Sequence, residues 1–227
     1  GESSEKHKKW LKLFCSDNSK YSYVKQKKSK GIFGAMNEGY NLALEDEWVL
    51  FWGSDDWCKS PETFENLNNL INDFLDEKEN IDFVICKGRY FEISSKKLGR
   101  ISEFSNLENK LISGSEFRNK LKRGFTPPHQ GVLFAPKINR RKFSYNEEYN
   151  IAADLEFFLR ISKNDDVCVL LLNHELVYMS DNGVSSKAII KKYREVLKAY
   201  KSTFGKVFLL VFLKRYLQKI NLLLSRL

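Results

Sequence analysis

A continuous apolar run at residues 48–52 ends in two aspartates, and it constrains the fold more than any other part of the chain. The run reads Trp-Val-Leu-Phe-Trp, which is typical of a strand covered on both faces. A Gly-Ser pair then breaks the strand, so Asp55 and Asp56 follow its carboxyl end. Ligands of open α/β sheets bind beyond the carboxyl ends of strands. Paired carboxylates there predict a site for a hard cation, Mg²⁺ or Mn²⁺.

The aspartate pair also has a simpler explanation. Asp tolerates turn geometry and caps helices, so Asp55 and Asp56 could be no more than a turn. The next helix is expected to begin at Pro61, and Ser60 fits its capping position better than Asp56 does. The residues alone leave both interpretations open.

Helical and strand-like apolar patterns alternate along the first 186 residues. Helices are expected over 5–14, 32–44, 61–75, 114–121 and 152–162, and strands over 21–24, 48–52, 81–86, 132–135, 167–172 and 176–179. Residues 90–93 would extend a strand or start a hairpin, and Ser113 or Ser115 would cap the helix at 114. This alternation indicates an α/β sheet with helical crossovers.

Size and composition favour one folded domain with an appendage. The chain has 227 residues, of which 42% are hydrophobic and 14% aromatic, and this argues against disorder. Its four cysteines are scattered without a Cys-x-x-Cys pair, so neither a zinc site nor a disulfide framework is expected. This cysteine usage fits a reducing, cytoplasmic setting.

The positive charge is concentrated near the end of the chain. The net charge is +9, and residues 187–227 hold eleven Lys or Arg against one acid, Glu195. Residues 1–186 are therefore close to neutral, which argues against a nucleic-acid groove along the whole protein. No nucleic-acid recognition motif or phosphate-cradling Gly-x-x-x-x-Gly-Lys loop is present, so a nucleic-acid partner is not expected.

The basic segment at 187–227 reads as an amphipathic helical tail. Residues 207–213 are seven apolar residues in a row, and basic residues follow among leucines. This is shorter and more charged than the roughly 20 apolar residues that a spanning helix needs. The tail could lie on an anionic membrane surface, or pack on the domain or a partner.

Four separated segments together resemble the family 2 glycosyltransferases, especially the bacterial branch that builds surface polysaccharides. Residues 30–39 (KGIFGAMNEG) resemble the family's KGIYDAMNKG helix, and residues 50–56 (LFWGSDD) its LFLNSDD motif. Residues 129–134 (HQGVLF) are similar to its HQ strand, and residues 149–160 (YNIAADLEFFLR) to YKIAADYDLFLRL. Residues 182–185 (NGVS) resemble its GGVS. Gly34 departs from the family, which usually has Asp there.

The resemblance implies a GT-A-like (Rossmann-like) mixed sheet flanked by helices over residues 1–186, with 187–227 as a basic helical tail. The opening residues, Gly-Glu-Ser-Ser, resemble the end of the family's DGGSTDGT loop. We therefore expect the first strand of the fold and most of the second to precede residue 1, so that the chain is truncated at its N-terminus. Unpaired neighbouring strands would be costly when buried.

By resemblance, the reaction is sugar transfer from a nucleotide diphosphate sugar to an acceptor hydroxyl, with inversion, in polysaccharide or glycan biosynthesis. Asp56 is expected to hold Mn²⁺ or Mg²⁺, with Asp55 facing the metal or the ribose. The cation would stabilise the charge of the nucleoside diphosphate leaving group. Gly31, Asn37 and Ser54 are expected to border the donor.

The resemblance also assigns the acceptor half of the site. Asp154 is expected to be the base that deprotonates the attacking hydroxyl, with a helix cap or a first-turn acid as its alternative role. His129, Gln130 and Trp57 are expected on the acceptor side, where the acceptor is a glycan or lipid-linked. A structural hydrogen bond is the alternative for His129, and core packing is the alternative for Trp57.

Two other function classes stay open on the residues. One is a metal-dependent phosphatase or nuclease built on the aspartate pair, which would need further acidic or histidine ligands. The other is a non-catalytic remnant that binds a ligand or docks through the tail. The expected location is cytoplasmic, with peripheral attachment to the inner face of the plasma membrane through residues 187–227 as an option.

Overall fold

The computed structural model describes residues 4–26, 31–75, 81–92, 97–102, 104, 109–136, 144–180 and 188–224, with side chains up to residue 217. Its helical elements are α1 (Glu5–Asp17), α2 (Gly31–Tyr40), α3 (Thr63–Leu75), α4 (Gly114–Lys122), η1 (His129–Gly131), α5 (Ala153–Ile161), α7 (Ile189–Phe204), η3 (Gly205–Val207) and α8 (Phe208–Leu224). Its strands are β1 (Val49–Leu50), β2 (Phe83–Glu92), β3 (Lys97–Ser102), β4 (Lys110–Ser113), β5 (Val132–Phe134) and β6 (Cys168–Ser180).

One mixed sheet holds all of these strands, as expected. The order is β1-β5-β2-β6-β4, and β3 pairs with the outer part of β2. β2 and β6 pair in parallel from Phe83↔Val169 onward, and the other pairings between described strands are antiparallel. A mixed α/β sheet with this central parallel pair is therefore the frame on which the candidate site stands.

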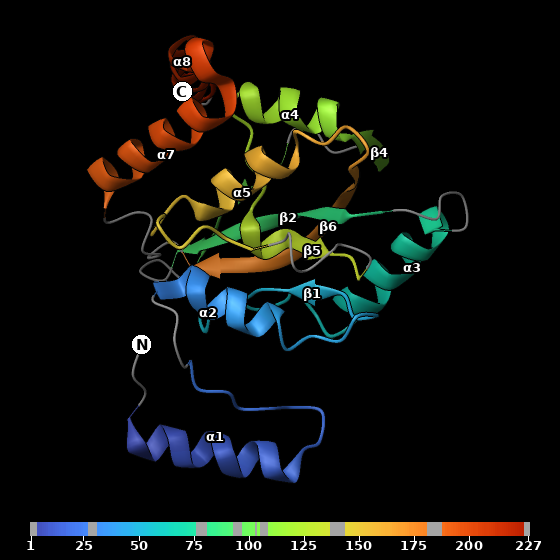
Figure 1. Ribbon diagram of the computed structural model, residues 1–227. Coiled ribbons are helices and arrows are strands. Elements are labelled where there is room, and N and C mark those ends of the chain that lie inside the picture. Colours follow the sequence, from blue (N-terminus) through green and yellow to red (C-terminus); the bar gives the residue numbers. More distant parts are fainter. Residues whose placement is uncertain are drawn as a thin grey trace.

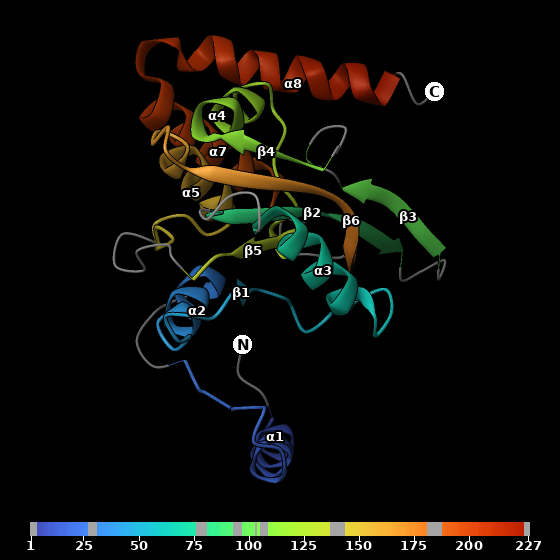
Figure 2. The same ribbon diagram turned by 90° about the vertical axis from the view of Figure 1, so that its right-hand side faces the viewer.

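Helices cover both faces of the sheet (Figure 1). Alternate residues of β2 divide between two hydrophobic clusters, as the two-residue period of a strand requires. Phe83 and Ile85 belong to the cluster that includes side chains of α4, α5 and α7. Val84 and Cys86 belong to the cluster that includes side chains of α3. Figure 2 shows the same layering from the side, with α4, α5, α7 and α8 on one side of the sheet and α3 on the other.

The α4 helix illustrates how local sequence sets an element. Ser113 accepts a hydrogen bond from the Glu116 backbone N–H at 3.3 Å, and the Glu116 carboxylate accepts one from the Ser113 N–H at 3.0 Å. This reciprocal capping box satisfies two backbone donors at the start of the helix. Ser113, one of the two expected caps, is therefore the N-cap.

Several boundaries differ from the sequence-based expectation. Residues 21–24 form no strand, and the expected strand at 48–52 is hydrogen-bonded only over Val49–Leu50. The helix expected from Pro61 begins at Thr63, because residues 61–62 form a turn. The two short strands expected at 167–172 and 176–179 are one strand, β6. A register irregularity opposite Lys87 absorbs the polar residues between its two apolar runs.

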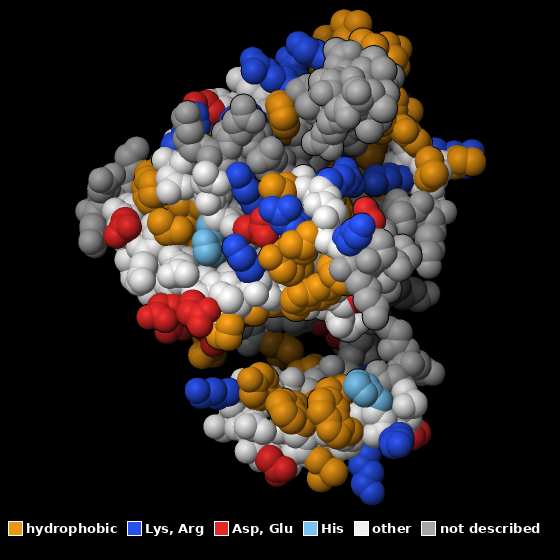
Figure 3. All heavy atoms as spheres, turned by 180° about the vertical axis from the view of Figure 1, so that it is seen from behind, with side chains coloured by type: hydrophobic (Ala, Val, Ile, Leu, Met, Phe, Trp, Pro, Cys, Tyr) orange, Lys and Arg blue, Asp and Glu red, His pale blue; other side chains and the backbone are white. Residues whose placement is uncertain are grey.

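The two ends of the described chain pack differently. α1 lies apart from the sheet in both ribbon views, none of its residues is buried, and Trp10 and Leu13 are more than half exposed. Hydrophobic side chains are accordingly visible on this helix at the bottom of Figure 3. By contrast, α7 buries Val196, Ala199 and Tyr200 against the domain. No helix in the described ranges is both long and apolar enough to cross a bilayer.

Arg215 anchors α8 to the domain. It is 5% exposed, and its Nη1 donates to Gly124 O at 3.1 Å, Thr126 Oγ1 at 3.0 Å and the Tyr200 hydroxyl at 3.1 Å. Gly124 has φ 95°, and a Cβ there would lie 2.9 Å from Arg215 Cγ. The glycine therefore supplies both the turn conformation and the space for the arginine.

Candidate active site

The Asp55–Asp56 turn brings two carboxylates to one side of a glycine. Gly53 N–H donates to Asp56 Oδ2 at 2.6 Å, and Asp56 N–H donates to Gly53 O at 3.3 Å. A Cβ added to Gly53 would lie 2.8 Å from Asp55 Oδ1 and 3.0 Å from Asp56 Oδ2. The two carboxylates therefore flank the same small cradle above Gly53, which a larger residue would fill.

Contacts on both sides fasten this turn to the sheet. The Trp52 indole Nε1 donates to Gln130 O at 2.9 Å. Trp57 and Tyr178 exchange two backbone hydrogen bonds, at 3.1 and 2.8 Å, and their rings meet edge to face. The turn that carries the carboxylates is thus attached to η1 on one side and to the C-terminal end of β6 on the other. Trp57 keeps 39% of its surface exposed, next to the turn.

Burial and a neighbouring carboxylate set the electrostatics of the turn. Burial raises the pKa of Asp56, the nearby Asp55 raises it further, and hydrogen bonds from the Gly53 N–H and the Gln130 side chain oppose this. When desolvation and a like charge raise the pKa of a carboxyl group, a positive neighbour stabilises its ionised form. The described residues contain no cluster of three or more His, Cys, Asp and Glu that could hold a metal. A cation here would take two carboxylates from the protein and its remaining oxygens from a ligand or water, which suits Mg²⁺ or Mn²⁺.

His129 and Gln130 are neighbours in sequence but occupy different environments. His129 is buried, its Nε2 lies 2.7 Å from the Tyr145 hydroxyl, and its ring stacks on Phe51. Burial lowers the pKa of His129 to about 4, so its imidazole is neutral at physiological pH. Gln130 is partly exposed and its side chain hydrogen-bonds Asp56. Of the two, Gln130 is the residue placed beside the carboxylate pair.

Asp154 lies in the first turn of α5, one residue after the helix begins. The N-cap residue is Ala152, so Asp154 is not the cap. Its Oδ1 accepts a hydrogen bond from the Leu155 N–H at 2.7 Å. Burial raises the pKa of Asp154, while the Leu155 N–H and the positive charges of Lys192 and Arg215 lower it. A carboxyl group with a raised pKa is a stronger base once ionised.

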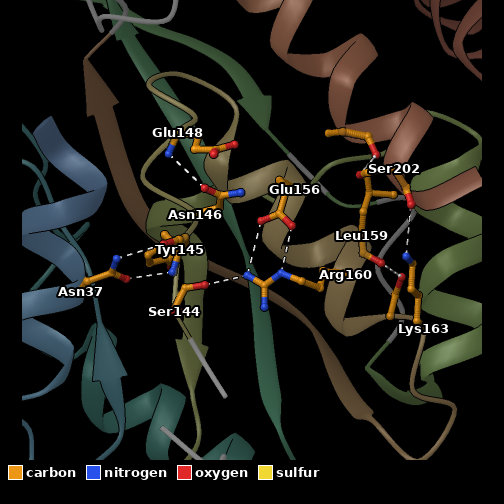
Figure 4. A network of polar contacts seen from close by, with 12 residues as sticks. Asn37, Ser144, Tyr145, Asn146, Glu148, Glu156, Leu159, Arg160, Lys163 and Ser202 are labelled. Atoms are coloured by element: carbon orange, nitrogen blue, oxygen red, sulfur yellow. Dashed lines mark hydrogen bonds and ion pairs between the residues drawn. The ribbon is translucent and has the colours of Figure 1, made fainter. Parts of the chain in front are cut away.

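Asn37 holds the loop that leads to Asp154 (Figure 4). Its Oδ1 accepts from the Tyr145 N–H at 2.8 Å, and its Nδ2 donates to Tyr145 O at 3.0 Å and Glu147 Oε1 at 3.1 Å. The amide thus pairs with the loop as a strand partner would. Figure 4 also shows Arg160 reaching the other side of the loop, where its Nη2 donates to Ser144 O.

Tyr145 links the two halves of the candidate site. Its hydroxyl contacts His129, the neighbour of Gln130 in η1, and the charge of Asp154 raises its pKa further beyond the effect of burial. A chain of contacts therefore runs from Asp56 through η1 and Tyr145 toward Asp154. Sequence reasoning did not single out Tyr145, because a lone tyrosine in a loop carries no motif.

The remaining candidates lie at exposed or undescribed places. Gly31 begins α2 with φ 76°, is exposed, and has open space where a Cβ would project. Ser54 is exposed in the aspartate turn. Lys30 and residues 182–185, which carry part of the family resemblance, lie outside the described residues. The donor-side roles of Gly31, Asn37 and Ser54 stay predictions.

A separate cavity of about 520 Å³ lies beside Trp48. Trp48 precedes β1, whereas the two aspartates follow β1. Its lining residues are mostly apolar: Glu45, Asp46, Trp48, Leu75, Ile81, Ala135 and Pro136. None of the candidate catalytic or metal-binding residues lines it, so we do not assign it to the site.

Comparison with known protein families identifies the family of the chain. The model of the family described as "Glycosyl transferase family 2" matches residues 1–140, more than half of the chain. The chain belongs to glycosyl transferase family 2. The matched region includes the aspartate turn and η1, and it ends before Asp154. No curated protein sequence matches the chain significantly.

Solved structures show the same fold. The chain is similar to a structure of S. aureus TarS residues 1–349, with a TM-score of 0.57 and 16% identity over 92% of this chain and 58% of that one. It is also similar to a second TarS structure, with a TM-score of 0.61 and 16% identity over 95% of this chain and 36% of that one. At this identity the likeness establishes a GT-A-like architecture, and the chain spans 58% or less of each matched structure.

Proposed function

We propose that this family 2 glycosyltransferase chain transfers a sugar from a nucleotide diphosphate sugar to an acceptor hydroxyl, with inversion and with the help of a divalent cation. The observation that carries the proposal is the turn in which Asp55 and Asp56 flank the open cradle at Gly53. Family membership supports the reaction class. A glycan or a lipid-linked sugar in polysaccharide biosynthesis is the proposed acceptor.

On the donor side, Asp56 and Asp55 would hold Mn²⁺ or Mg²⁺ together with the donor diphosphate. Such a cation, when bound, offsets the negative charge that develops on the leaving nucleoside diphosphate. Gly31 and Ser54 offer exposed backbone and a hydroxyl to the donor. Asn37 is already paired with Tyr145, so its contribution would be to hold the loop at the edge of the donor site.

On the acceptor side, Asp154 would take the proton of the attacking hydroxyl. Its raised pKa suits this role, because the proton is transferred to the carboxylate as the sugar bond forms. Gln130 and Trp57 would contact the acceptor beside the turn. His129, neutral and bonded to Tyr145, would fix η1 behind them.

The test is hydrolysis of a panel of uridine, guanosine and thymidine diphosphate sugars by the full-length protein, with and without Mn²⁺. Asp56→Ala should lower Mn²⁺-dependent release of nucleoside diphosphate by ~10²-fold or more, as losing a dedicated charge stabiliser does. Asp73→Ala, which removes an exposed carboxylate of α3, is the matched control and should hydrolyse normally. Equal rates for Asp56→Ala and the control would refute the metal assignment.

The same assay separates the competing classes. A phosphatase or nuclease would release inorganic phosphate or cleave a nucleic-acid strand, and a non-catalytic module would bind donors without turnover. The described residues gather no third His, Cys, Asp or Glu with the aspartates into a metal-binding cluster, which favours the transferase over the phosphatase and nuclease class.

We also propose that the tail docks on the cytoplasmic surface of an anionic membrane. η3 and α8 leave a row of apolar side chains uncovered, and they are at least half exposed: Val207 of η3, and Leu209, Leu210, Leu213 and Leu217 of α8. Hydrophobic side chains of this helix are visible near the top of Figure 3. Basic residues flank the row, as in helices that lie in the headgroup region of anionic bilayers.

Vesicle flotation tests this attachment. Leu210→Ser with Leu213→Ser should reduce flotation with phosphatidylglycerol vesicles, while phosphatidylcholine vesicles should retain little of either protein. Leu98→Ser, at an exposed leucine of β3, is the control. Equal flotation of the control and the α8 variant would refute docking through this face.

A further inference from the structure

Glu195 is an unusual residue in its surroundings. It is the one acid among eleven basic residues in the segment 187–227, and it is 8% exposed on the face of α7 that packs on the domain. A buried carboxylate is costly unless hydrogen bonds satisfy it. Its partners are therefore informative about what the helix does.

The Glu195 carboxylate accepts hydrogen bonds from three successive backbone N–H groups. Oε2 accepts from Ile151 at 2.8 Å and from Ala152 at 2.9 Å, and both carboxylate oxygens lie 3.1 Å from the Asn150 nitrogen. Successive N–H groups that converge in this way form an anion-binding concavity. In this protein a side chain from 43 to 45 residues downstream fills it.

This arrangement replaces a local cap at the start of α5. The N-cap residue is Ala152, whose side chain has no oxygen, and it makes no capping hydrogen bond. The first N–H groups of a helix need acceptors, and a negative charge near them is favourable. The remote carboxylate of Glu195 supplies that charge to the chain that enters α5.

The candidate base stands two residues beyond Ala152. Among the contacts described, its own carboxylate is hydrogen-bonded to backbone N–H groups alone, those of Leu155 and of Asp154 itself, so the backbone at the start of α5 sets its position. Lys192, three residues before Glu195 on α7, acts on the charge of Asp154. The same helix thus fixes the backbone of the base and contributes to its electrostatic surroundings.

We propose that Glu195 is a positioning residue of the transferase: by binding the N–H groups of residues 150–152, it holds Asp154 in line with the acceptor hydroxyl. This inference rests on the proposed function. It also assigns the first half of the basic tail to the active site, because the residue that fixes the base belongs to α7.

The experiment compares Glu195→Gln and Glu195→Asp with wild type in the full-length protein. Glu195→Gln keeps the length of the side chain and removes its charge, whereas Glu195→Asp keeps the charge and shortens the reach. Glu148→Gln is the matched control, because Glu148 lies in the same loop and, within the described ranges, its carboxylate pairs with the exposed Lys198. Amide hydrogen exchange, donor affinity, transfer kinetics and pH profile are measured for each protein.

The expected result is a loss of rate without a loss of donor binding. Exchange at residues 150–152 should accelerate in Glu195→Gln, and kcat for transfer should fall by ~10- to ~100-fold, since a displacement of about 1 Å has this cost. The dissociation constant for the nucleotide sugar should stay within about two-fold, because the donor half of the site is not touched. Glu195→Asp should fall between wild type and Glu195→Gln.

The pH profile separates positioning from a direct charge effect. Among the described side chains, those whose charge is coupled to Asp154 are Tyr145, Lys192 and Arg215, and Glu195 is not one of them. The acid limb of the rate profile should therefore stay in place in Glu195→Gln while the plateau falls. A displaced limb with an unchanged plateau would contradict positioning and identify Glu195 as a charge modulator.

Two further outcomes would overturn the proposal. Exchange at residues 150–152 equal to that of the Glu148→Gln control would show that Glu195 does not hold the loop. Faster exchange with wild-type kcat would show that the loop does not position the base. If wild type itself turns over none of the donors while exchange still depends on Glu195, the proposed function fails and the role of Glu195 in catalysis fails with it, but its hold on the loop stands.

Discussion

The two carboxylate regions of this protein are built in opposite ways. The Asp55–Asp56 turn is shaped by two hydrogen bonds between residues 53 and 56, one of them to the Asp56 carboxylate, while contacts of the flanking tryptophans fasten it to the sheet. The region of Asp154 is held by distant residues, with Asn37 on one side of the preceding loop and Glu195 on the other. The sequence of the aspartate turn is contained in seven consecutive residues, 50–56. The arrangement around Asp154 forms only when distant parts of the domain have come together.

This difference predicts which step each region controls. The aspartate turn presents carboxylates to solvent and to a cation, so its variants should affect the donor and the metal. The Asp154 region is desolvated and positioned, so its variants should affect transfer. Substitutions in the two regions therefore test whether donor binding and transfer are controlled separately.

The largest effect should come from Asp154→Asn. The amide keeps an oxygen to accept from the Leu155 N–H, but it cannot take a proton from the acceptor. Transfer should fall by ~10²- to ~10⁴-fold, the range for loss of a general base. Titration calorimetry should find unchanged donor binding, whereas Asp56→Ala should weaken binding of the donor with Mn²⁺. Equal transfer by wild type and Asp154→Asn would remove Asp154 as the base.

A second prediction concerns the anchor of the tail. Arg215→Met would leave the oxygens of Gly124, Thr126 and Tyr200 without their donor, at a cost of about 2 kcal/mol in the free energy of unfolding. Urea denaturation measures this loss. Lys214→Met, at the exposed neighbouring position, should be neutral. If both variants unfold alike, Arg215 does not anchor α8.

Gly53→Ala should perturb the aspartate turn alone. The added Cβ would lie within 3.0 Å of both carboxylates and push them apart, which should weaken Mn²⁺ binding by about 10-fold. Gly39→Ala has open space around its Cβ and is the control. Amide exchange at residues 150–152 should not change in either variant. Altered exchange there would mean that the two regions are coupled.

The smallest effect should be a shift in pH dependence. The pKa of Asp154 is raised above its ordinary value of 3.8 by burial, so transfer should be lost as the pH falls through this raised pKa. Because Lys192 lowers that pKa, Lys192→Met should move the acid limb to higher pH. Lys191→Met, at the exposed adjacent position, should leave it in place. An unmoved limb in Lys192→Met would show that Lys192 does not act on the base.

The free energy of unfolding should also depend on the ionisation of Asp154, but in the opposite direction: it should fall as the pH rises, whereas transfer should increase. A raised pKa means that folding favours the protonated form of Asp154, so its contribution to stability is present at low pH and lost as the pH rises through the raised pKa. Asp154→Asn should therefore be more stable than wild type near neutral pH. On the proposed function, the ionised carboxylate that acts as the base is retained at a cost to stability.

The sequence was sufficient for those features that are set by neighbouring residues. The alternating apolar pattern predicted the helices and most strands of the mixed sheet, and the Ser113 cap followed from the capping preference of serine. The aspartate turn was also found, since Gly, Ser and Asp are adjacent there. Residues 21–24 have the composition of a strand but form none, and composition cannot show whether a strand finds a partner.

The features that the sequence did not predict depend on contacts across long separations. Strands β3 and β4 are short and partly polar, and they are strands because β2 and β6 offer open edges. Asn37 reaches a partner 108 residues away, and Glu195 reaches partners 43 to 45 residues away. The isolation of Glu195 among basic residues was a visible signal, but it did not reveal which N–H groups the carboxylate would bind.

The origin of Glu195 has a consequence for the order of events during synthesis. Chains fold as they leave the ribosome, with earlier segments first. The hydrogen bonds within the aspartate turn, and its contacts with η1 and β5, need no residue beyond 134, and only the bridge to Tyr178 is made later. The loop before Asp154 cannot be secured until α7 has been made, some 40 residues after the base itself. On the proposed function, the nascent chain would therefore acquire the aspartates of its metal site before the base is positioned for transfer.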